Sequence, residues 1–484
     1  MATTGTVRTR GAAPPAPGPP AGPPARLRFG YASGSLVTAT FTTLPGLLLL
    51  PYLTDTLGVG AALAGLVVFV PKAWDALLNP LVGRASDRTR TRWGARRPYV
   101  LWGGLAMAAA FALTFAGPLP GPAGAWFTAA GYLLTATAFA FFQVPYVAMP
   151  AELATRDEDR MRLVGGRVAV IGVAALVTGA AAPALIDAGG GGLAGHRWAG
   201  AFGAVVIALG ALWVFAGTSG SGSCPQSPAG AAGSGPEPAA PALRAADATV
   251  RTLPGPPAPV RAADTEPGLR RQFAAARANP SFAALLRCAV VQSAATGVLL
   301  AGAPYFADHV LRHPAGVAPL VVAFVAPNLL TVPLWSRLRG RRGHALASGL
   351  FAAGCLLLLA APVLPDAAVL AAMALAGTGH AGQLLFLYAM LAQCTARTEH
   401  RRAGVLSGLF TTGEGLGVAV GPFVYGLVLQ LSGYVSSGTG RAAQQTAAAE
   451  LGLLAGFAAL PALATAAAVV LLRGYDRPPA PTDP

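Results

Sequence analysis

Apolar segments of about twenty residues recur along this chain, separated by shorter stretches that carry Gly, Pro, Arg and Asp. An α-helix of that length crosses the roughly 30 Å of hydrocarbon in a bilayer. Twelve such segments can be counted, at 31–53, 59–84, 98–119, 123–152, 163–187, 198–217, 281–311, 315–338, 344–364, 367–394, 403–431 and 451–472. The pattern predicts an all-α membrane protein with twelve transmembrane helices.

One long segment without apolar periodicity separates the first six spans from the last six. Residues 218–278 are rich in Gly, Ser, Pro and Ala, a composition that cannot bury a core. We therefore expect two six-helix bundles. The predicted segments are a disordered cytoplasmic tail (1–28), an N-terminal six-helix bundle (29–217), a flexible cytoplasmic linker (218–278), a C-terminal six-helix bundle (279–473) and a cytoplasmic C-terminal tail (474–484).

Basic residues are concentrated in alternate loops. The loops after the second, fourth, eighth and tenth spans hold the arginines of 84–97, 156–162, 337–342 and 397–402. Since loops rich in Lys and Arg stay in the cytoplasm, we expect both termini and the linker there, and the protein in an inner or plasma membrane.

Composition supports the membrane assignment. Of the 484 residues, 54% are hydrophobic and 11% are charged, whereas average proteins have about 25% charged residues. The net charge of +15 comes largely from arginines between apolar spans, so we expect no nucleic-acid partner. The four cysteines lack Cys-x-x-Cys spacing, so we expect neither a disulfide framework nor a zinc site.

The second predicted span carries polar residues where apolar ones are expected. Lys72, Asp75 and Asn79 are spaced i, i+3 and i+7, which places them on one helix face within an arc of about 60°. Charged residues inside a span usually line a pathway for a solute or ion. The alternative is a buried Lys72–Asp75 pair that only fixes the helix in place. Lys72 is also the chain's single lysine.

Glu414 is a second carboxylic acid inside a span. It lies about eleven residues into the eleventh span, roughly 16 Å from the cytoplasmic end. It has no basic neighbour in the sequence, and a buried carboxylic acid can avoid the cost of a buried charge by binding a proton. Glu414 is therefore a candidate proton-coupling residue; the alternative is a glutamate that only joins two helices.

Two further groups of titratable residues have more than one interpretation. Arg167, near the start of the fifth span, could pair with Asp75, contact an anionic part of a solute, or extend to the cytoplasmic interface. His309 and His313, beside Asp308, have the i, i+4 spacing of a metal pair. They fall at an external helix end before a proline, so we expect a solvated turn.

The loop after the second span combines an acidic residue with several arginines. Asp87 can pair with arginines of its own loop, and such clusters can hold the cytoplasmic side of a transporter closed in one state and separate in the other. The same arginines also define topology. The candidate cytoplasmic gate residues are Gly83, Asp87, Arg88, Arg92, Gly94 and Arg97.

From residue 72 to 98 the sequence resembles the glycoside–pentoside–hexuronide:cation symporters, a branch of the major facilitator superfamily. The residues that carry the resemblance are Lys72, Asp75, Asn79-Pro80, Gly83, Asp87, Thr89, Gly94 and Arg97-Pro98. Further matches lie at 145–163, 279–306 and 377–434. The resemblance implies the major facilitator fold and symport of a sugar, glycoside or similar small solute by alternating access. It also places Lys72, Asp75, Asn79, Gln143 and Arg167 at the solute and cation site.

The chain departs from this family pattern at several positions. Where sodium-coupled relatives have a second acidic residue, this chain has Asn79; their sugar-binding aspartates align with Ala39 and Gln143, and a lysine aligns with Gly415. Fewer carboxylates disfavour sodium coupling and a melibiose-like disaccharide. The coupling ion is therefore left as H⁺ or Na⁺, and no cofactor is expected.

Three classes of function differ in how well the sequence fits them. The first is a cation- or proton-coupled symporter. The second is an uncoupled or proton-coupled facilitator or exporter of an amphiphilic metabolite or lipid. The third, a membrane enzyme, is disfavoured because the six histidines are scattered and no nucleophile–base pair is evident. No phosphate-binding Gly-x-x-x-x-Gly-Lys motif occurs, so ATP is not the expected energy source. The expected partners are a small solute, a coupling cation and the lipid bilayer, with the protein as a monomer.

Overall fold

The computed structural model describes residues 23–117, 119, 121–154, 156–219, 279–311, 316–335, 337–338, 340–396, 400–438 and 443–475. The predicted linker after residue 219 and most of both predicted tails lie outside the described residues. Within them, every regular element is helical. Helix α1 starts at Ala25, inside the segment predicted as a disordered tail.

The N-terminal half contains six helical rods. In chain order its elements are α1 (Ala25–Ala32), α2 (Gly34–Pro51), η1 (Tyr52–Thr56), α3 (Ala61–Arg88), α4 (Arg97–Thr114), α5 (Gly121–Ala148), α6 (Pro150–Leu153), α7 (Asp157–Ala188) and α8 (Gly192–Gly217). The first three elements follow one another as one rod, and α6 is a single turn at the end of α5.

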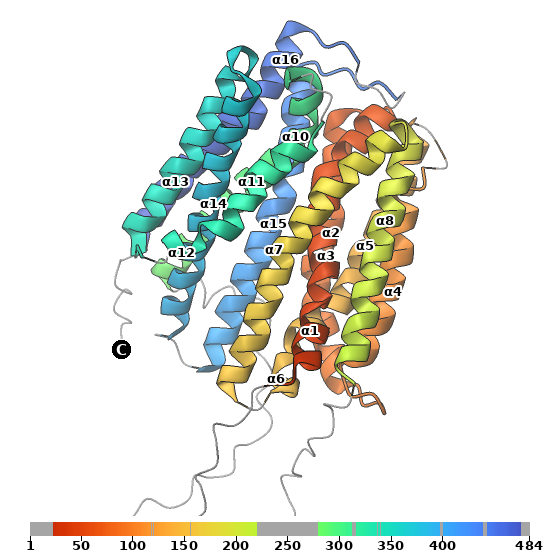
Figure 1. The fold of residues 1–484 in the computed structure, drawn as a ribbon, viewed down its shortest axis with the longest axis vertical. Helices are drawn as coiled ribbons and strands as arrows, with labels where there is room; N and C mark the ends of the chain where they lie inside the picture. The colour runs from red at the N-terminus through yellow and green to blue at the C-terminus, as the bar shows by residue number, and fades with distance from the viewer. Residues whose placement is uncertain are drawn as a thin grey trace, which may run out of the picture.

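The C-terminal half repeats this arrangement. Its elements are α10 (Pro280–Tyr305), η2 (Phe306–Leu311), α11 (Ala318–Leu330), α12 (Val332–Trp335), α13 (Gly340–Leu357), η3 (Leu358–Val363), α14 (Asp366–Ala396), α15 (His400–Leu431), α16 (Ala447–Leu454), η4 (Ala455–Ala459), α17 (Leu460–Leu471) and η5 (Leu472–Gly474). Figure 1 shows the two halves side by side, red to yellow-green on one side and green to blue on the other.

The helical rods correspond one to one with the twelve predicted spans. Ten helices of the described chain are long and apolar enough to cross a membrane, and Ala318–Leu330 is a shorter apolar helix. Three helical rods begin six residues before the predicted spans, at Ala25 rather than 31, at Gly192 rather than 198 and, in α7, at Asp157 rather than 163. The first turns of α7 are charged, so the helix continues beyond the apolar segment that the hydrophobic pattern detects.

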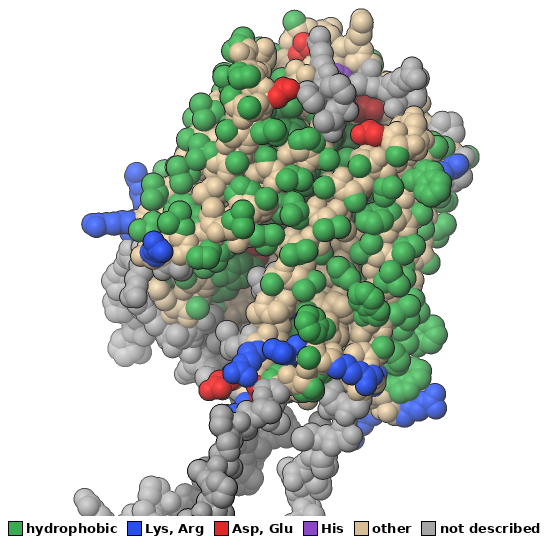
Figure 2. Space-filling model, viewed as in Figure 1, with side chains coloured by type: hydrophobic (Ala, Val, Ile, Leu, Met, Phe, Trp, Pro, Cys, Tyr) green, Lys and Arg blue, Asp and Glu red, His purple; other side chains and the backbone are tan. Residues whose placement is uncertain are grey.

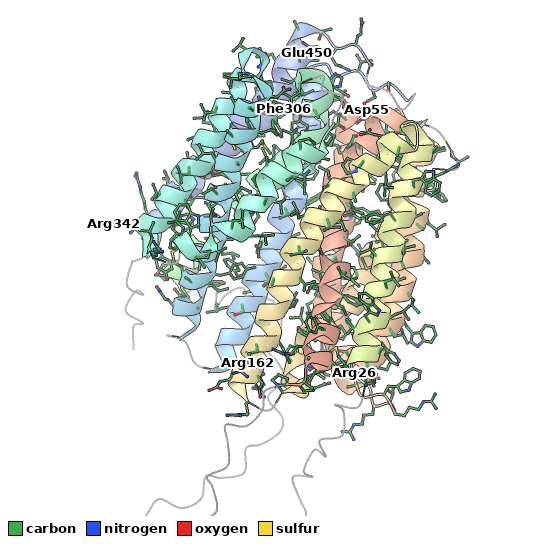
Figure 3. The ribbon with its side chains drawn as sticks, in the orientation of Figure 1. Arg26, Asp55, Arg162, Phe306, Arg342 and Glu450 are labelled. Carbon is green, nitrogen blue, oxygen red and sulfur yellow. The ribbon has the colours of Figure 1, made fainter. Side chains whose placement is uncertain are left out.

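The molecule has charge of opposite sign at its two ends. Arg26 and Arg162 lie at one end, whereas Asp55 and Glu450 lie at the other (Figure 3). On the face seen in Figure 2, hydrophobic side chains cover the middle and basic side chains gather mainly at the end with Arg26 and Arg162. An apolar band between polar ends is the surface that a bilayer requires.

The two halves touch closely at the acidic end and separate toward the basic end. A Cβ added to Gly65 of α3 would lie 2.9 Å from the Cα of Phe423 on α15, and one added to Gly426 would lie 2.5 Å from the Ala61 oxygen. Small residues allow helix backbones to approach this closely. Further along α15, a Cβ added to Gly415 or Gly408 would meet nothing within 4 Å. The space between the halves is therefore closed at one end.

We predict that Gly426→Ala destabilises the protein while Gly415→Ala does not. Both changes replace a helical glycine by a better helix former, but only the methyl at 426 collides with backbone of the other half. Overpacking of this kind costs about 1–3 kcal/mol. The measurement is the thermal unfolding midpoint of the purified variants in detergent; equal midpoints for the two variants would contradict the tight contact at Gly426.

Candidate solute and cation site

Lys72 is held against aromatic rings rather than against its neighbouring carboxylate. Its Nζ lies 3.5 Å from the centre of the Phe41 ring and 5.9 Å from that of Phe139, and 3.5 Å from the Phe41 carbonyl oxygen. A cation over an aromatic face gains about 2 kcal/mol or more when both are desolvated. Among the described residues no ion pair within 4.0 Å joins Lys72 to Asp75. The structure therefore shows no direct contact that would support a closed Lys72–Asp75 ion pair.

Asp75 and Asn79, on the same face of α3, each have a side-chain oxygen without a hydrogen-bond partner. The Oδ1 atoms of Asp75 and Asn79 are buried without a hydrogen-bond partner in the described structure. The hydroxyl of Tyr132 is buried in the same way, and it lies within the electrostatic range of Asp75. A buried polar atom without a partner costs about 1–3 kcal/mol. These oxygens have the chemistry to bind a cation, a proton or a solute hydroxyl.

Gln143 of α5 is held by α2. Thr38 donates a hydrogen bond of 2.8 Å to the Gln143 Oε1, which leaves the amide nitrogen available as a donor. Ala39, which aligns with a sugar-binding aspartate of the family, is fully buried. The fourth span therefore offers a neutral amide to the site, and the first span offers no carboxylate at the aligned position.

Arg167 and Glu414 come from different halves, and each lies beside a tyrosine. The Arg167 guanidinium lies 5.4 Å from the centre of the Tyr146 ring within the N-terminal half, and its Nε is buried without a partner among the described residues. The hydroxyl of Tyr388 on α14 donates a hydrogen bond of 2.6 Å to Glu414 Oε2. Both partners of this hydrogen bond belong to the C-terminal half, so Arg167 and Glu414 are each held within their own half.

The arginine loop is held mainly by Arg96, a residue outside the predicted gate set. Arg96 pairs with Asp87 at 3.3 Å and with Glu152 at 3.2 Å, and Nη1 donates to the Ala148 carbonyl. Arg97 donates a hydrogen bond of 2.6 Å to the Phe215 oxygen at the end of α8. These contacts join four helix ends of the N-terminal half.

The other predicted gate residues have local roles. Gly94 has φ +95°, a conformation that favours glycine. Arg92 lies 5.0 Å from the Trp93 ring, and Gly83 and Arg88 belong to α3, which Arg88 ends. No hydrogen bond or ion pair among the described residues joins this loop to the C-terminal half.

The sequence predicted charged residues for the site but not the aromatic side chains that lie beside them. Phe41, Tyr132, Tyr146 and Tyr388 contact or polarise the predicted residues. The available signal was a tyrosine hydroxyl in the middle of an apolar span. No hydrogen bond or ion pair among the described residues joins Asp75 to Glu414, so their common role stays a prediction.

His309 does not occupy the solvated turn that was expected. It is only 8% exposed, and its Nε2 lies 3.2 Å from the hydroxyl of Tyr434. That expectation is wrong for His309 because the end of α10 packs against the loop after α15. His313 lies outside the described residues. His380, another lone histidine, stacks on Phe324 with ring centres 5.4 Å apart, a packing role.

A groove of about 750 Å³ between α4 and α5 lies apart from these polar residues. It is lined almost entirely by apolar side chains, among them Trp102, Leu113 and Phe141. All three side chains are exposed on the outside of the helices, so the groove belongs to the lipid-facing surface. It is not the site of the charged residues.

The model of a family described as MFS/sugar transport protein matches residues 30–240 and 251–476. A protein of Escherichia coli described as the putative glycoside/cation symporter YagG is 30% identical over 182 residues, 37% of this chain and 39% of its own length. A glucuronide carrier protein homolog of the same species is 38% identical over 78 residues, 16% of this chain and 17% of its own. The chain thus aligns with well under half of these relatives' lengths.

Solved structures resemble the whole chain at lower identity. A bacterial homologue of the human drug peptide transporters has a TM-score of 0.61 at 14% identity, over 93% of this chain and 96% of that one. A bacterial homologue of the human lysosomal transporter Spinster has a TM-score of 0.60 at 17% identity, over 93% of both chains. These matches confirm the predicted fold.

We predict that Arg96→Lys weakens the arginine cluster whereas Arg92→Lys does not. A lysine cannot reproduce the forked contacts of Arg96 to Asp87, Glu152 and the Ala148 carbonyl. The exposed Arg92 lies beside the Trp93 ring, a contact that a lysine can also make. Losing a charge-assisted hydrogen bond costs about 1.5–3 kcal/mol. The comparison is made by thermal unfolding of both variants; an unchanged midpoint for Arg96→Lys would show that the cluster contributes little.

Proposed function

The chain belongs to the MFS/sugar transport protein family, and from that premise we propose that it carries a sugar, glycoside or similar small solute across a membrane together with a cation. Transport would proceed by alternating access, with the site opening to one side of the membrane at a time. The relatives described as glycoside/cation symporter and glucuronide carrier homolog support this solute class. A transport family also argues against a membrane enzyme. The missing sugar-binding carboxylates at Ala39 and Gln143 fit a facilitator or exporter, but the descriptions of the relatives favour a symporter.

The observation that carries the proposal is the set of polar atoms on one face of α3. The Oδ1 atoms of Asp75 and Asn79 lack partners among the described residues, and Lys72 is held on the Phe41 ring instead of on Asp75. A carboxylate kept apart from its neighbouring cation can accept a proton or cation without first breaking an ion pair. Asp75 is therefore assigned as a cation-binding residue, with Asn79 and Gln143 as hydrogen-bonding groups for the solute.

Glu414 is assigned as the second coupling carboxylate. It accepts a 2.6 Å hydrogen bond from Tyr388. Binding or loss of a proton at Glu414 would change the charge that the C-terminal half carries inside the span, and the change would link protonation to the relative position of the halves. A proton is preferred to sodium because a neutral amide, Asn79, stands where a second carboxylate would ligate the metal ion.

The proposed orientation has the arginine-rich end in the cytoplasm. Both termini and the linker would then be cytoplasmic, and the membrane would be the inner or plasma membrane. With that orientation, the contact between Gly426 and Ala61 closes the external side. The structure would be an inward-facing conformation of a monomeric carrier that needs no cofactor.

We expect uptake of a glycoside by proteoliposomes to be driven by an imposed proton gradient. A panel of glycosides, pentosides and hexuronides is tested with proton and sodium gradients imposed separately. Accumulation above equilibrium with the proton gradient alone supports the proposal. Accumulation only with sodium would overturn the choice of ion, and flux that is independent of both gradients would overturn symport.

We expect Glu414→Gln to abolish proton-driven accumulation while solute exchange at equal concentrations continues. The amide keeps the size and hydrogen-bond acceptor of the side chain but cannot bind a proton. Proton-driven uptake should fall by about tenfold or more, which corresponds to at least about 1.4 kcal/mol. Glu158→Gln, an exposed glutamate at the start of α7, is the matched control. Unchanged proton dependence in Glu414→Gln would remove Glu414 from the mechanism.

A further inference from the structure

At the end opposite the arginine loop, a series of hydrogen bonds links the two halves. The hydroxyl of Tyr434, in the loop after α15, donates a hydrogen bond of 2.8 Å to Asp55 Oδ1 in η1. The Nε2 of His309 in η2 lies 3.2 Å from the same hydroxyl. Asp55 and Phe306, the first residue of η2, lie at this same end of the molecule in Figure 3.

The chemistry of the three side chains determines which group donates and which accepts in each of these hydrogen bonds. A carboxylate only accepts hydrogen bonds, so the tyrosine proton points to Asp55 and the tyrosine oxygen accepts from His309 Nε2–H. Burial and the nearby charge of Asp55 raise the pKa of Tyr434, so the hydroxyl keeps the proton that it donates. His309 and Tyr434 both belong to the C-terminal half, so the Tyr434–Asp55 bond is the link that joins the halves.

Other contacts between the halves surround this link. Ser437 donates a 2.8 Å hydrogen bond to the Asp55 carbonyl, and Ser436 donates one of 2.8 Å to the Val59 carbonyl. The hydroxyls of Thr54 and Tyr305 lie 2.7 Å apart. Asp55 is thus bound through both its side chain and its backbone.

Asp55 and His309 both lie in irregular helical turns. Asp55 lies in a π-helical turn at the end of α2, and His309 lies in a π-helical turn at the end of α10. Such turns are rare and occur mostly at functional sites. In contrast, the ion pairs of the arginine loop at the other end stay within the N-terminal half.

We propose that Asp55, Tyr434 and His309 form the external gate of the transporter, and that the Tyr434–Asp55 hydrogen bond is broken each time the central site opens to the outside. The inference rests on the proposed alternating-access function. Bonds to a carboxylate are roughly twice as strong as neutral ones, so this link biases the protein toward the state closed on the external side. His309 orients the Tyr434 hydroxyl and acts as a positioning residue.

The matched control is another tyrosine of the same cluster. Tyr425 lies next to Tyr305, with ring centres 5.7 Å apart, and its hydroxyl bonds at 3.4 Å to the Leu453 carbonyl within the C-terminal half. Tyr434→Phe and Tyr425→Phe each remove one buried hydroxyl. Only the first removes a bond between the halves.

The experiment measures opening to the outside without any solute. A reporter cysteine is placed at Gly415, where an added Cβ meets nothing within 4 Å, and a membrane-impermeant maleimide is added outside intact cells. Labelling of the chain without this reporter is subtracted; Cys288, Cys355 and Cys394 are buried. We expect Tyr434→Phe and Asp55→Ala to raise the labelling rate at least about threefold, which corresponds to about 0.7 kcal/mol, and Tyr425→Phe to leave it unchanged.

Two further variants separate the gate from general destabilisation. Asp55→Asn keeps a hydrogen-bond acceptor and should raise labelling less than Asp55→Ala. The double variant Asp55→Ala/Tyr434→Phe should label no faster than the faster single variant, because both changes remove the same bond. Equal labelling for Tyr434→Phe, Tyr425→Phe and the parent, or additive effects in the double variant, would overturn the gate. Since no solute is used, failure of the gate is distinguishable from failure of the proposed transport.

Discussion

The structure depends on the cost of placing charge in hydrocarbon. An ionised side chain inside a span is expensive unless it faces the bundle interior, water or another polar group. The charged residues within the spans satisfy this constraint in different ways. Lys72 lies on the Phe41 ring, Arg167 on the Tyr146 ring, and Glu414 accepts from Tyr388. Each of these three side chains thus contacts an aromatic side chain, and no described ion pair neutralises it within its own span.

In the proposed mechanism, this use of aromatic partners leaves the charges free to respond to a ligand. An ion pair between Lys72 and Asp75 would have to break before Asp75 could bind a cation, whereas an aromatic ring supports the ammonium without occupying the carboxylate. The unpartnered oxygens of Asp75 and Asn79 are consistent with this arrangement.

The contacts at the two ends of the molecule differ in kind. At the acidic end, glycines bring α3 and α15 into backbone contact, and Tyr434 and Asp55 add a directional bond between the halves. At the basic end, Arg96 gathers Asp87 and Glu152 within one half and leaves the other half unattached among the described residues. A bundle joined at one end and separate at the other has the asymmetry that alternating access requires.

Hydrophobic period and charge placement in the sequence were sufficient for the number of spans, the division into two halves and the polar face of α3. These features depend on residues close together in the chain, such as the i, i+3, i+7 spacing of Lys72, Asp75 and Asn79. The edges of helices were less well predicted, since the charged first turns of α7 carry no apolar signal.

Contacts between distant residues were decided by the tertiary structure alone. Nothing in the sequence pairs Asp55 with Tyr434, 379 positions away, or makes Arg96 rather than Arg97 the partner of Asp87 and Glu152. We expected His309 to be solvated because it falls at a helix end before a proline, yet packing against the loop after α15 buries it. The sequence determined which residues lie inside the membrane, because hydrophobicity is a local property. The tertiary structure decided which of them meet, because that depends on how twelve helices pack.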